Sequence, residues 1–251
     1  MEVSEKTVSR VCAEHGAYES KTVQIMGRSI SRSCPSCATE SEKRQVAADR
    51  RQADHDQARR IEARFHRSGI PLRFQARTFA NYKASNGGQE RALRISEGYA
   101  RQWDEMKRKG ACMIFTGSPG TGKTHLGCAI ANAIIDMGSS SALFATVTDA
   151  LRSIKSAYSK DAGISETDAI STLVEPALLI LDEVGTDVGT EHSKMLLFDV
   201  LNKRYENLRC TIILTNLDIP ALTEYFGERI MDRLREGGGK LVTFAWESHR
   251  A

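Results

Sequence analysis

The segment that decides the fold reads Gly117-Ser118-Pro119-Gly120-Thr121-Gly122-Lys123-Thr124. It fits the pattern G-x-x-x-x-G-K-[ST] and lies between an apolar, strand-like run and a helix-like segment, which is the context that this pattern requires. The glycines allow backbone amides to curl around phosphate groups, and the N-terminus of the following helix adds the positive end of its dipole. We expect Lys123 to bridge the β- and γ-phosphates of a nucleotide and Thr124 to offer its hydroxyl to Mg²⁺. His125 is included among the candidate nucleotide contacts, and a glycine-rich turn without a ligand is the alternative.

Apolar runs of strand length alternate with helical segments from about residue 70 onward. The strand candidates are Ala111–Thr116, Ala142–Val147, Ala177–Leu181, Thr211–Thr215 and Leu241–Trp246. The segment Lys123–Met137 has apolar residues at helical spacing along one face. Short apolar strands separated by helices predict an α/β fold with a parallel sheet that is buried on both faces.

Polar residues follow two of the strand candidates. Asp182 and Glu183 end the apolar run Ala177–Leu181, and Asn216 follows Thr211–Thr215. Because the carboxyl ends of parallel strands open onto the ligand crevice, we expect Asp182 to hold the Mg²⁺ shell. Glu183 would orient and deprotonate the attacking water, and Asn216 would position that water near the γ-phosphate. The alternatives are exposed acids after a buried strand and an ordinary turn start. The combination favours ATP hydrolysis over phosphoryl transfer to an acceptor.

The segment Gly227-Glu-Arg229-Ile-Met-Asp-Arg233-Leu places two arginines four residues apart on one helical face. In ring-forming ATPases such a helix presents an arginine to the γ-phosphate of the neighbouring subunit. The alternative is a solvated helix in which Glu228 and Asp232 pair locally with the arginines.

Cys12-x₂-His15 is followed, after a gap of 18 residues, by Cys34-Pro-Ser-Cys37. Two ligand pairs at this spacing, each on a tight turn, predict a tetrahedral Cys₃His zinc site with a short hairpin between them. A segment of this length has too little core to fold alone, so a metal would supply the missing stability. The alternative is four unrelated side chains in a tail. We expect the other cysteines, Cys112, Cys128 and Cys210, to be buried as small apolar residues.

Composition divides the chain into a zinc-ribbon-like head (1–39), a charged helical linker (40–68) and a nucleotide-binding domain (69–251). The linker has no Gly or Pro, only a thin apolar stripe, and is ended by Gly69-Ile70-Pro71. The net charge of +3 lies within the first 70 residues, which hold 13 Lys/Arg and 10 Asp/Glu. The N-terminus is too polar for a secretory signal and no apolar run would span a bilayer, so we expect a cytoplasmic protein without a membrane partner.

With these residues assembled, the chain resembles the DnaC-type helicase loaders of bacteria and phages over roughly residues 64–250. The shared-looking pieces are GSPGTGKTHL, LLILDEVG, ILTNL, GERIMDRLR and the closing W-x-S-x-R. The resemblance implies an AAA+ fold with a five-stranded parallel sheet, ATP and Mg²⁺ binding, and assembly with a ring-shaped DnaB-type replicative helicase on single-stranded DNA. It also implies self-assembly or a hexameric complex on that helicase.

The resemblance assigns further residues. Arg233 or Arg229 is the arginine finger, and Arg250 is the second-sensor arginine at the phosphates. It also implies that residues 149–167 touch single-stranded DNA. That stretch offers basic and aromatic side chains that can track phosphates and stack a base, namely Arg152, Lys155, Tyr158 and Lys160. The alternative is an amphipathic helix with Leu151, Ile154 and Tyr158 facing the core.

The Cys/His pattern departs from the best-known DnaC-type loaders, which lack it. The DnaI loaders of Gram-positive bacteria carry a zinc-binding N-terminal domain, and we associate the present combination with phage or prophage replication proteins. The leading hypothesis is an ATP-dependent helicase loader. The runner-up is an IstB-type transposition helper that acts on duplex DNA, and a third is an interaction module that does not hydrolyse ATP.

Overall fold

The computed structural model describes residues 5–25, 28–31, 33–138, 140–158, 163–186 and 190–248. The chain divides into two compact units, Met1–Arg59 and Arg60–Ala251, and each is described by itself below. No helix of the described ranges is both long enough and apolar enough to cross a membrane.

The first unit is a small antiparallel sheet followed by a long helix. Its strands β1 (Glu5–Cys12), β2 (Gly16–Ile25) and β3 (Arg28–Ser31) are hydrogen-bonded in the order β1-β2-β3. A hairpin between the two ligand pairs is present as β2 and β3, but the residues that suggested it, Tyr18, Val23 and Ile25, all lie on β2. Strand β1 adds a third strand that the sequence did not suggest. A tight turn joins β1 to β2, because Cys12 pairs directly with Gly16.

Helix α1 (Pro35–Arg67) begins five residues before the predicted linker and ends one residue before its predicted end. The Cys34-Pro-Ser-Cys37 stretch is therefore not a separate tight turn, and that part of the prediction is wrong. The physical reason is Pro35, which occupies the first helical position, where its missing N–H costs nothing and its φ is already helical. The amide of Ala38 donates to the carbonyl of Cys34, which closes the first turn.

The second unit is built on a five-stranded parallel sheet with the order β5-β6-β7-β4-β8. Its strands are β4 (Met113–Gly117), β5 (Ala142–Thr146), β6 (Leu178–Val184), β7 (Cys210–Thr215) and β8 (Lys240–Phe244). All five predicted strands are confirmed, with ends displaced by up to three residues. The largest displacement is at the end of β6, which continues through Asp182 and Glu183 to Val184. The start of β4 and the end of β8 each differ from the prediction by two residues.

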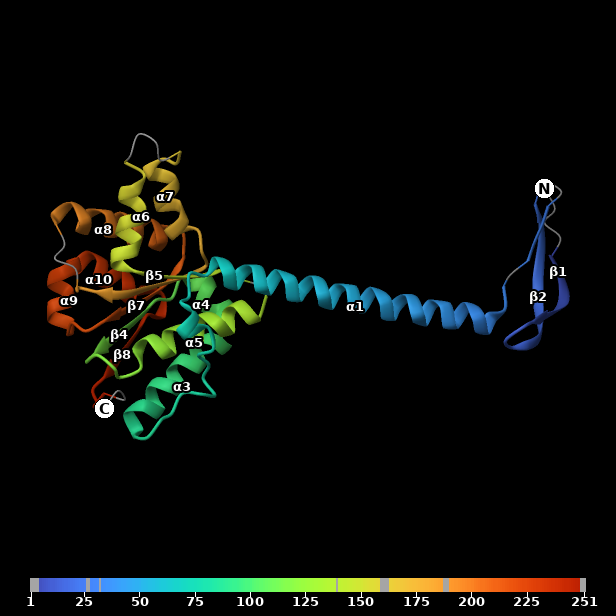
Figure 1. Ribbon diagram of the computed structural model, residues 1–251, viewed down its shortest axis with the longest axis horizontal. Helices are drawn as coiled ribbons and strands as arrows, with labels where there is room; N and C mark the ends of the chain where they lie inside the picture. Colours follow the sequence, from blue (N-terminus) through green and yellow to red (C-terminus); the bar gives the residue numbers. More distant parts are fainter. Residues whose placement is uncertain are drawn as a thin grey trace. The chain divides into compact units, whose positions relative to one another are not determined.

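Helices cover both faces of this sheet (Figure 1). One face packs against α2 (Leu72–Gln75), α3 (Gly87–Arg101), α4 (Trp103–Lys109) and α5 (Lys123–Asp136). The other packs against α6 (Val147–Ser156), α7 (Glu166–Val174), α8 (Glu191–Glu206), α9 (Ile219–Phe226) and α10 (Glu228–Arg235). A 3₁₀ turn (Glu236–Gly238) leads into β8.

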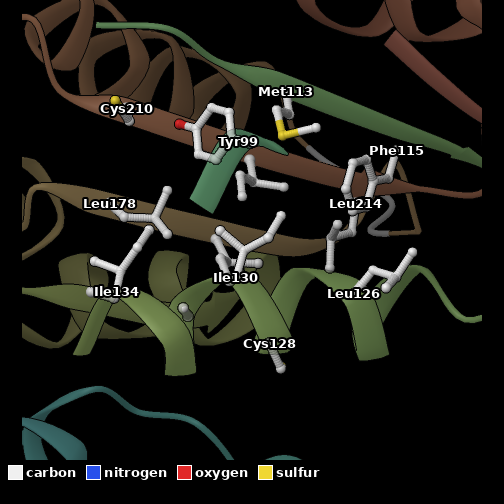
Figure 2. Close-up of a cluster of buried hydrophobic side chains, with 14 of the residues drawn as sticks. Tyr99, Met113, Phe115, Leu126, Cys128, Ile130, Ile134, Leu178, Cys210 and Leu214 are labelled. Carbon is white, nitrogen blue, oxygen red and sulfur yellow. The ribbon is translucent and has the colours of Figure 1, made fainter. Parts of the chain in front are cut away.

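Helix α5 is the centre of the first core. Figure 2 shows Leu126, Ile130 and Ile134 pointing from α5 toward the sheet, where they meet Phe115, Leu178 and Leu214. All of these side chains are fully buried, so the helix that follows the glycine-rich loop is fixed against the strands that carry the polar residues. The prediction that Cys112, Cys128 and Cys210 are buried is confirmed.

A single arginine ties the second core together. Arg204 of α8 is fully buried, and its guanidinium donates to the carbonyls of Leu173, Val174 and Pro176 at distances of 2.8, 3.0 and 3.0 Å. It also donates to the Thr211 hydroxyl at 3.0 Å and to the carbonyl of Cys210. Burial lowers the pKa of Arg204 to about 10, which leaves the group charged at neutral pH. The end of α7, helix α8 and strand β7 are thus joined through one side chain.

Candidate functional site: a phosphate-binding loop and a Cys/His cluster

The glycine-rich loop runs from the end of β4 to the first turn of α5, as the sequence pattern predicts. Gly117, Gly120 and Gly122 all have positive φ values of 142°, 80° and 98°, which side chains with a Cβ rarely adopt. Space is also limited, because a Cβ on Gly122 would lie 2.8 Å from Cε2 of Tyr82. The loop is therefore held in a curled conformation by its glycines and by a neighbouring aromatic ring.

Lys123 is buried and is held by three acceptors around its ammonium group. Nζ donates to the carbonyls of Gly117 at 2.6 Å and Ser118 at 2.8 Å, and to Oδ1 of Asn216 at 2.8 Å. The contact with Asn216 joins the glycine-rich loop to the end of β7, 93 residues further along the chain. The two residues that the sequence assigned to phosphate contact and water positioning are therefore brought together.

Thr124 and Asp182 lie side by side at the carboxyl ends of the strands. The Thr124 hydroxyl donates to Oδ2 of Asp182 at 2.9 Å, and the Glu183 amide donates to Oδ1 at 2.8 Å. Burial raises the pKa of Asp182, because its charged form is desolvated. A hydroxyl beside a partly desolvated carboxylate is a donor set that suits Mg²⁺, and the cation would offset the cost of burying the charge.

Glu183 differs from its neighbour in exposure and in backbone conformation. Its side chain is exposed, and its φ of 61° lies in the left-handed region, which is uncommon for residues other than glycine. Backbone strain of this kind is concentrated at functional sites. The two consecutive carboxylates have different surroundings, because Asp182 contacts Thr124 and Glu183 is exposed to solvent.

A cavity of about 420 Å³ opens beside the loop. It is lined on one side by the loop and α5, and on the other by a segment that sequence reasoning did not assign to the site: Arg73, Phe74, Arg77, Asn81, Tyr82 and Lys83. Apolar rings next to basic side chains and a phosphate-binding loop suit a nucleoside with attached phosphates. The sequence patterns did not assign this segment to the site, because it contains only the short helix α2 and irregular structure, without periodicity.

Asn132 connects this cavity wall to α5. It is buried, and its Nδ2 donates to the carbonyls of Phe74, Gln75 and Arg77 at 3.2, 3.0 and 2.8 Å. These carbonyls belong to the end of α2 and the residues after it, and a helix end leaves such carbonyls without intrahelical partners. Among the described residues, Oδ1 of Asn132 has no hydrogen-bond partner. Asn132 therefore positions the wall that faces the nucleotide loop.

His125 and Tyr82 extend the same wall. His125 Nε2 lies 3.0 Å from the carbonyl of Thr78, and the rings of His125 and Tyr82 meet edge to face at 5.1 Å. Burial lowers the pKa of His125 below its usual value, so the ring is neutral at pH 7. His125 contacts the wall rather than the glycine-rich loop.

The segment around Trp246, after strand β8, packs against the glycine-rich loop. The indole N–H of Trp246 donates to the carbonyl of Thr121 at 3.0 Å, and its ring lies 4.9 Å from that of Phe244. Trp246 is the first residue of the W-x-S-x-R piece, so the loop and the C-terminal segment are in direct contact. Arg250 lies outside the described residues.

The two candidate finger arginines on α10 have different surroundings. Arg229 is exposed, whereas Arg233 is half-buried, with its guanidinium 4.9 Å above the ring of Tyr205. Among the described residues, Nη1 of Arg233 has no hydrogen-bond partner. Arg229 therefore faces solvent, whereas Arg233 packs on the Tyr205 ring.

The candidate DNA residues lie on and after α6. Leu151 and Ile154 are buried as the amphipathic alternative predicted, but Tyr158 is exposed. Arg152 is paired with Asp149 at 3.0 Å, and Lys155 donates to the Ser193 hydroxyl at 3.0 Å. The Tyr158 hydroxyl lies 3.2 Å from Nε2 of His192, which adds a second ring to this surface. Lys160 lies outside the described residues.

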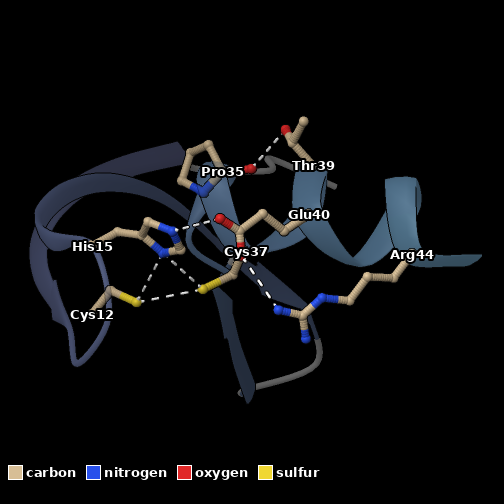
Figure 3. Close-up of polar contacts among 7 residues, drawn as sticks. All are labelled: Cys12, His15, Pro35, Cys37, Thr39, Glu40 and Arg44. Carbon is tan, nitrogen blue, oxygen red and sulfur yellow. Dashed lines mark hydrogen bonds and ion pairs between the residues drawn. The ribbon is translucent and has the colours of Figure 1, made fainter.

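The N-terminal ligand candidates converge into one cluster. The ligand atoms of Cys12, His15, Cys34 and Cys37 all lie within 4.8 Å of one another. Figure 3 shows the contacts of His15 Nδ1 with the sulfurs of Cys12 and Cys37, at 3.8 and 3.2 Å, and the two sulfurs lie 3.5 Å apart. A tetrahedral zinc with ordinary bond lengths would need edges of about 3.5–3.8 Å. The side chains therefore fit a tetrahedral Cys₃His metal centre.

Two further features suit a bound cation. His15 Nε2 donates to Oε1 of Glu40 at 3.2 Å, which leaves Nδ1 to face the sulfurs, as outer carboxylates do at metal-binding histidines. Hydrogen bonds, the largest from the Glu14 backbone, lower the pKa of Cys12 to about 6. The hydrogen bond with Cys12 is the largest cause that raises the pKa of Cys37 to about 12, and charge repulsion between the two sulfurs adds to it. A cation between them would remove that repulsion.

Comparisons with known proteins agree with this architecture. The sequence model of a family described as "IstB-like ATP binding protein" matches residues 41–240. The replicative helicase loader DnaC of Escherichia coli (strain K12) is 34% identical over 196 residues, or 78% of each chain. The DnaC of Buchnera aphidicola subsp. Acyrthosiphon pisum is 36% identical over 184 residues, or 73% of each chain.

A solved structure shares the fold of the second unit. The crystal structure of the DnaC helicase loader superposes with a TM-score of 0.61 at 25% identity, covering 69% of this chain and 99% of that one. Sequence and structure therefore lead to the same conclusion: the chain belongs to the IstB-like ATP-binding proteins, in the DnaC-type group of AAA+ P-loop ATPases.

Proposed function

We propose that this protein is an ATP-dependent loader that delivers a ring-shaped, DnaB-type replicative helicase to single-stranded DNA in the cytoplasm. The observation that carries the proposal is the contact of Lys123 with Asn216 beside the Thr124–Asp182 pair, which brings three separate sequence motifs to one sheet edge. The group to which the chain belongs includes proteins named replicative helicase loaders, and the similarity extends over about three quarters of both chains.

The nucleotide would occupy the cavity between the glycine-rich loop and the wall formed by residues 73–83. Its phosphates would take the place of the loop carbonyls as partners of Lys123, within a loop that runs from Gly117 through Ser118, Pro119, Gly120, Thr121 and Gly122. Thr124 and Asp182 would hold Mg²⁺, which neutralises charge on the phosphates. Arg250 would contact the phosphates from the C-terminal side.

Hydrolysis requires a positioned water and a proton acceptor. Exposed Glu183, which follows the magnesium ligand directly, is suited to accept the proton of the attacking water. Asn216 would orient that water once Lys123 has released its Oδ1 in favour of the phosphates. An arginine from α10 of a neighbouring chain, Arg233 or Arg229, would complete the site, so we expect turnover to require assembly into a ring or spiral.

The Cys/His cluster is proposed to hold one structural Zn²⁺ through Cys12, His15, Cys34 and Cys37. The donor set of three sulfurs and one imidazole nitrogen is typical of structural zinc, and all four ligands come from the protein. Such a site supplies stability to a small sheet that has little core of its own.

The test is co-migration with a DnaB-type helicase on a sizing column in the presence of ATP. The wild type and Glu183→Gln, which should bind ATP without hydrolysing it, are expected to co-elute with the helicase. Lys123→Ala, which should not bind ATP productively, is expected to elute separately. If no variant co-elutes with any such helicase, the proposal is wrong.

A second candidate is a transposition helper that acts on duplex DNA, because the matching family description is IstB-like. Fluorescence anisotropy with single-stranded and duplex oligonucleotides separates the two. A loader should prefer the single strand, through the surface that carries Arg152, Lys155 and Tyr158, and Lys160 is proposed as a further contact. Substituting Tyr158 with alanine should then weaken binding to the single strand. Preference for the duplex with ATP would favour the helper.

A further inference from the structure

We propose that the metal centre formed by Cys12, His15, Cys34 and Cys37 is the N-terminal anchor of α1. The bound metal fixes the first turn of this helix against the β1–β2 turn, and residues 35–52 are stably helical only when the metal is present. This inference concerns the first unit alone, and it holds whichever partner the ATPase serves.

The first observation is where the ligands lie. Cys34 occupies the position directly before the first helical residue, since its carbonyl accepts the first intrahelical hydrogen bond, from Ala38 at 2.9 Å. Cys37 lies within the first turn of α1. Cys12 and His15 come from the end of β1 and the turn after it. A metal bound to all four ligands therefore joins the helix start to the sheet.

The second observation is that, apart from Pro35 at its first position, α1 has none of the usual polar residues that start a helix. There is no acidic residue in its first turn, and the residue before Pro35 is a cysteine rather than Ser, Thr, Asp or Asn. Glu40, the first acidic residue along α1, has its carboxylate hydrogen-bonded to His15 and so belongs to the metal centre. Metal-bound thiolates at this end would supply the negative charge that complements the helix dipole.

The third observation is that α1 has little else to stabilise it over this range. Every side chain of residues 41–52 is exposed, so no apolar face of this part of the helix is buried. Its described side-chain contacts are of the i,i+4 type, such as Gln45 to Asp49 at 2.9 Å, and each such pair contributes only a few tenths of a kcal/mol. A polar helix of this kind depends on how it is initiated.

Helix initiation gives the expected size of the effect. Starting a helix has an equilibrium weight of about 10⁻³ at each position. In a segment of 33 residues the helix can start at any position, so the helical state is disfavoured by about 30-fold relative to a helix whose first turn is already fixed. Removing the metal should lower hydrogen-exchange protection in residues 38–52 by about this factor.

Glu40 acts as a positioning residue in this arrangement. Its carboxylate holds the His15 ring with Nδ1 toward the sulfurs, and Arg44 lies 3.8 Å from its other oxygen (Figure 3). Glu42 is a matched control, because it has the same side chain, lies in the same helix and is exposed. Loss of an outer-shell partner lowers metal affinity by about 10–100-fold.

The experiment uses the full-length protein under reducing conditions, with Zn²⁺ as the probe. Metal content is measured by elemental analysis, and Co²⁺ substitution is followed by its visible absorption, which reports tetrahedral thiolate ligation. Hydrogen exchange with mass spectrometry then compares loaded and chelator-treated protein. We expect one metal per chain, and about a 30-fold loss of protection in residues 38–52 after chelation. Peptides from α5 should not change.

Variants make the outcome decisive. Cys37→Ser should abolish metal retention and reproduce the loss of protection without chelator. Glu40→Ala should weaken zinc affinity by about 10–100-fold while keeping protection at saturating zinc, and Glu42→Ala should behave as the wild type. The inference is overturned if no metal is retained, or if protection of α1 is the same with and without metal. Equal affinities of the Glu40 and Glu42 variants would overturn the role of Glu40.

Discussion

Replacing Asn132 with aspartate should loosen the wall of the nucleotide cavity and lower the stability of the protein by an amount that depends on pH. The amide group of Asn132 faces three carbonyls, at 3.2, 3.0 and 2.8 Å, within a buried pocket between α2 and α5. Aspartate has nearly the same size but presents an oxygen where Asn132 presents an NH₂ group. Leucine at this position fills similar volume and brings neither a donor nor a charge.

The magnitudes follow from those contacts. The two amide hydrogens of Asn132 are shared among three carbonyls, so Asn132→Leu loses about two net hydrogen bonds. The same substitution removes Oδ1, which is buried without a hydrogen-bond partner among the described residues, and this partly offsets the loss of stability. We expect its free energy of unfolding to fall by about 1–2 kcal/mol. An ionised aspartate would be an uncompensated buried charge and should cost about 3–5 kcal/mol. The protonated acid can still donate one hydrogen bond and should resemble the leucine variant.

The sign of the pH dependence is fixed by the direction of the pKa shift. Burial and the facing carbonyl oxygens would raise the pKa of the new aspartate above its unfolded value of about 3.9. The folded state of the variant then holds a proton that the unfolded state has lost, so its stability falls as pH rises toward the folded pKa. The aspartate variant should therefore be less stable at pH 8 than at pH 5, relative to the wild type.

The assay is urea unfolding at both pH values, together with equilibrium binding of a fluorescent ATP analogue. If the wall is destabilised by about 1.4 kcal/mol, nucleotide binding should weaken by up to about tenfold. Asn207→Asp is the control, because the Asn207 amide also donates to a carbonyl, that of Lys203 at 2.7 Å, but is exposed. If Asn132→Asp has the same stability deficit at both pH values, or binds ATP as tightly as the wild type, the reasoning is refuted.

Three other predictions concern the core and the loop. Burial raises the pKa of Asp182, so ionisation of this group lowers the stability of the nucleotide-free protein as pH rises. Asp182→Asn should therefore flatten the pH dependence of the free energy of urea unfolding between pH 4 and 7, and it should abolish Mg²⁺-dependent ATP binding. Arg204→Met leaves the buried acceptors of five hydrogen bonds without their donor and should lower the free energy of unfolding by at least about 3 kcal/mol, as measured by denaturant titration; a loss below 1 kcal/mol would contradict this role. Trp246→Phe keeps a ring beside Phe244 but removes the hydrogen bond to the Thr121 carbonyl, so ATP affinity should fall by about 2–10-fold in equilibrium binding, and unchanged affinity would show that this contact is dispensable.

Most of the ATPase fold follows from local pattern. The five strands are apolar runs bounded by polar or turn residues, and periodicity identifies such segments well. The glycine-rich loop and the Asp182–Glu183 pair were predicted because each has a fixed position relative to a strand. The contact of Lys123 with Asn216 was predictable only as a shared sheet edge, since the sequence does not give the order β5-β6-β7-β4-β8.

The parts that the sequence did not indicate depend on tertiary contacts. The cavity wall around Phe74 and Tyr82 contains only the short helix α2 and irregular structure, and a buried asparagine 55 residues or more away along the chain positions it. Strand β1 ends at the first ligand, Cys12, and has no apolar alternation of its own, so only its pairing with β2 defines it. Pro35 was interpreted as a turn residue, although proline at the first position of a helix is an equally good interpretation.

The domain boundaries at residues 39 and 68 remain predictions, as do the roles of the two α10 arginines. Exposed Arg229 and Tyr205-stacked Arg233 differ in environment, but a finger acts on a neighbouring chain.

The first glycine of the phosphate loop has a consequence for engineering this protein. A Cβ on Gly117 would lie 2.3 Å from the carbonyl oxygen of Phe244, so the constraint at this position comes from strand β8 rather than from a phosphate. Strand β8 and the phosphate loop therefore pack so closely that the two segments, although far apart in the sequence, have to match each other. In a chimera that exchanges only the C-terminal 15 or so residues between relatives, the new strand β8 would not match the phosphate loop it packs against. Only exchanges that carry the loop and the C-terminal segment together should keep nucleotide affinity.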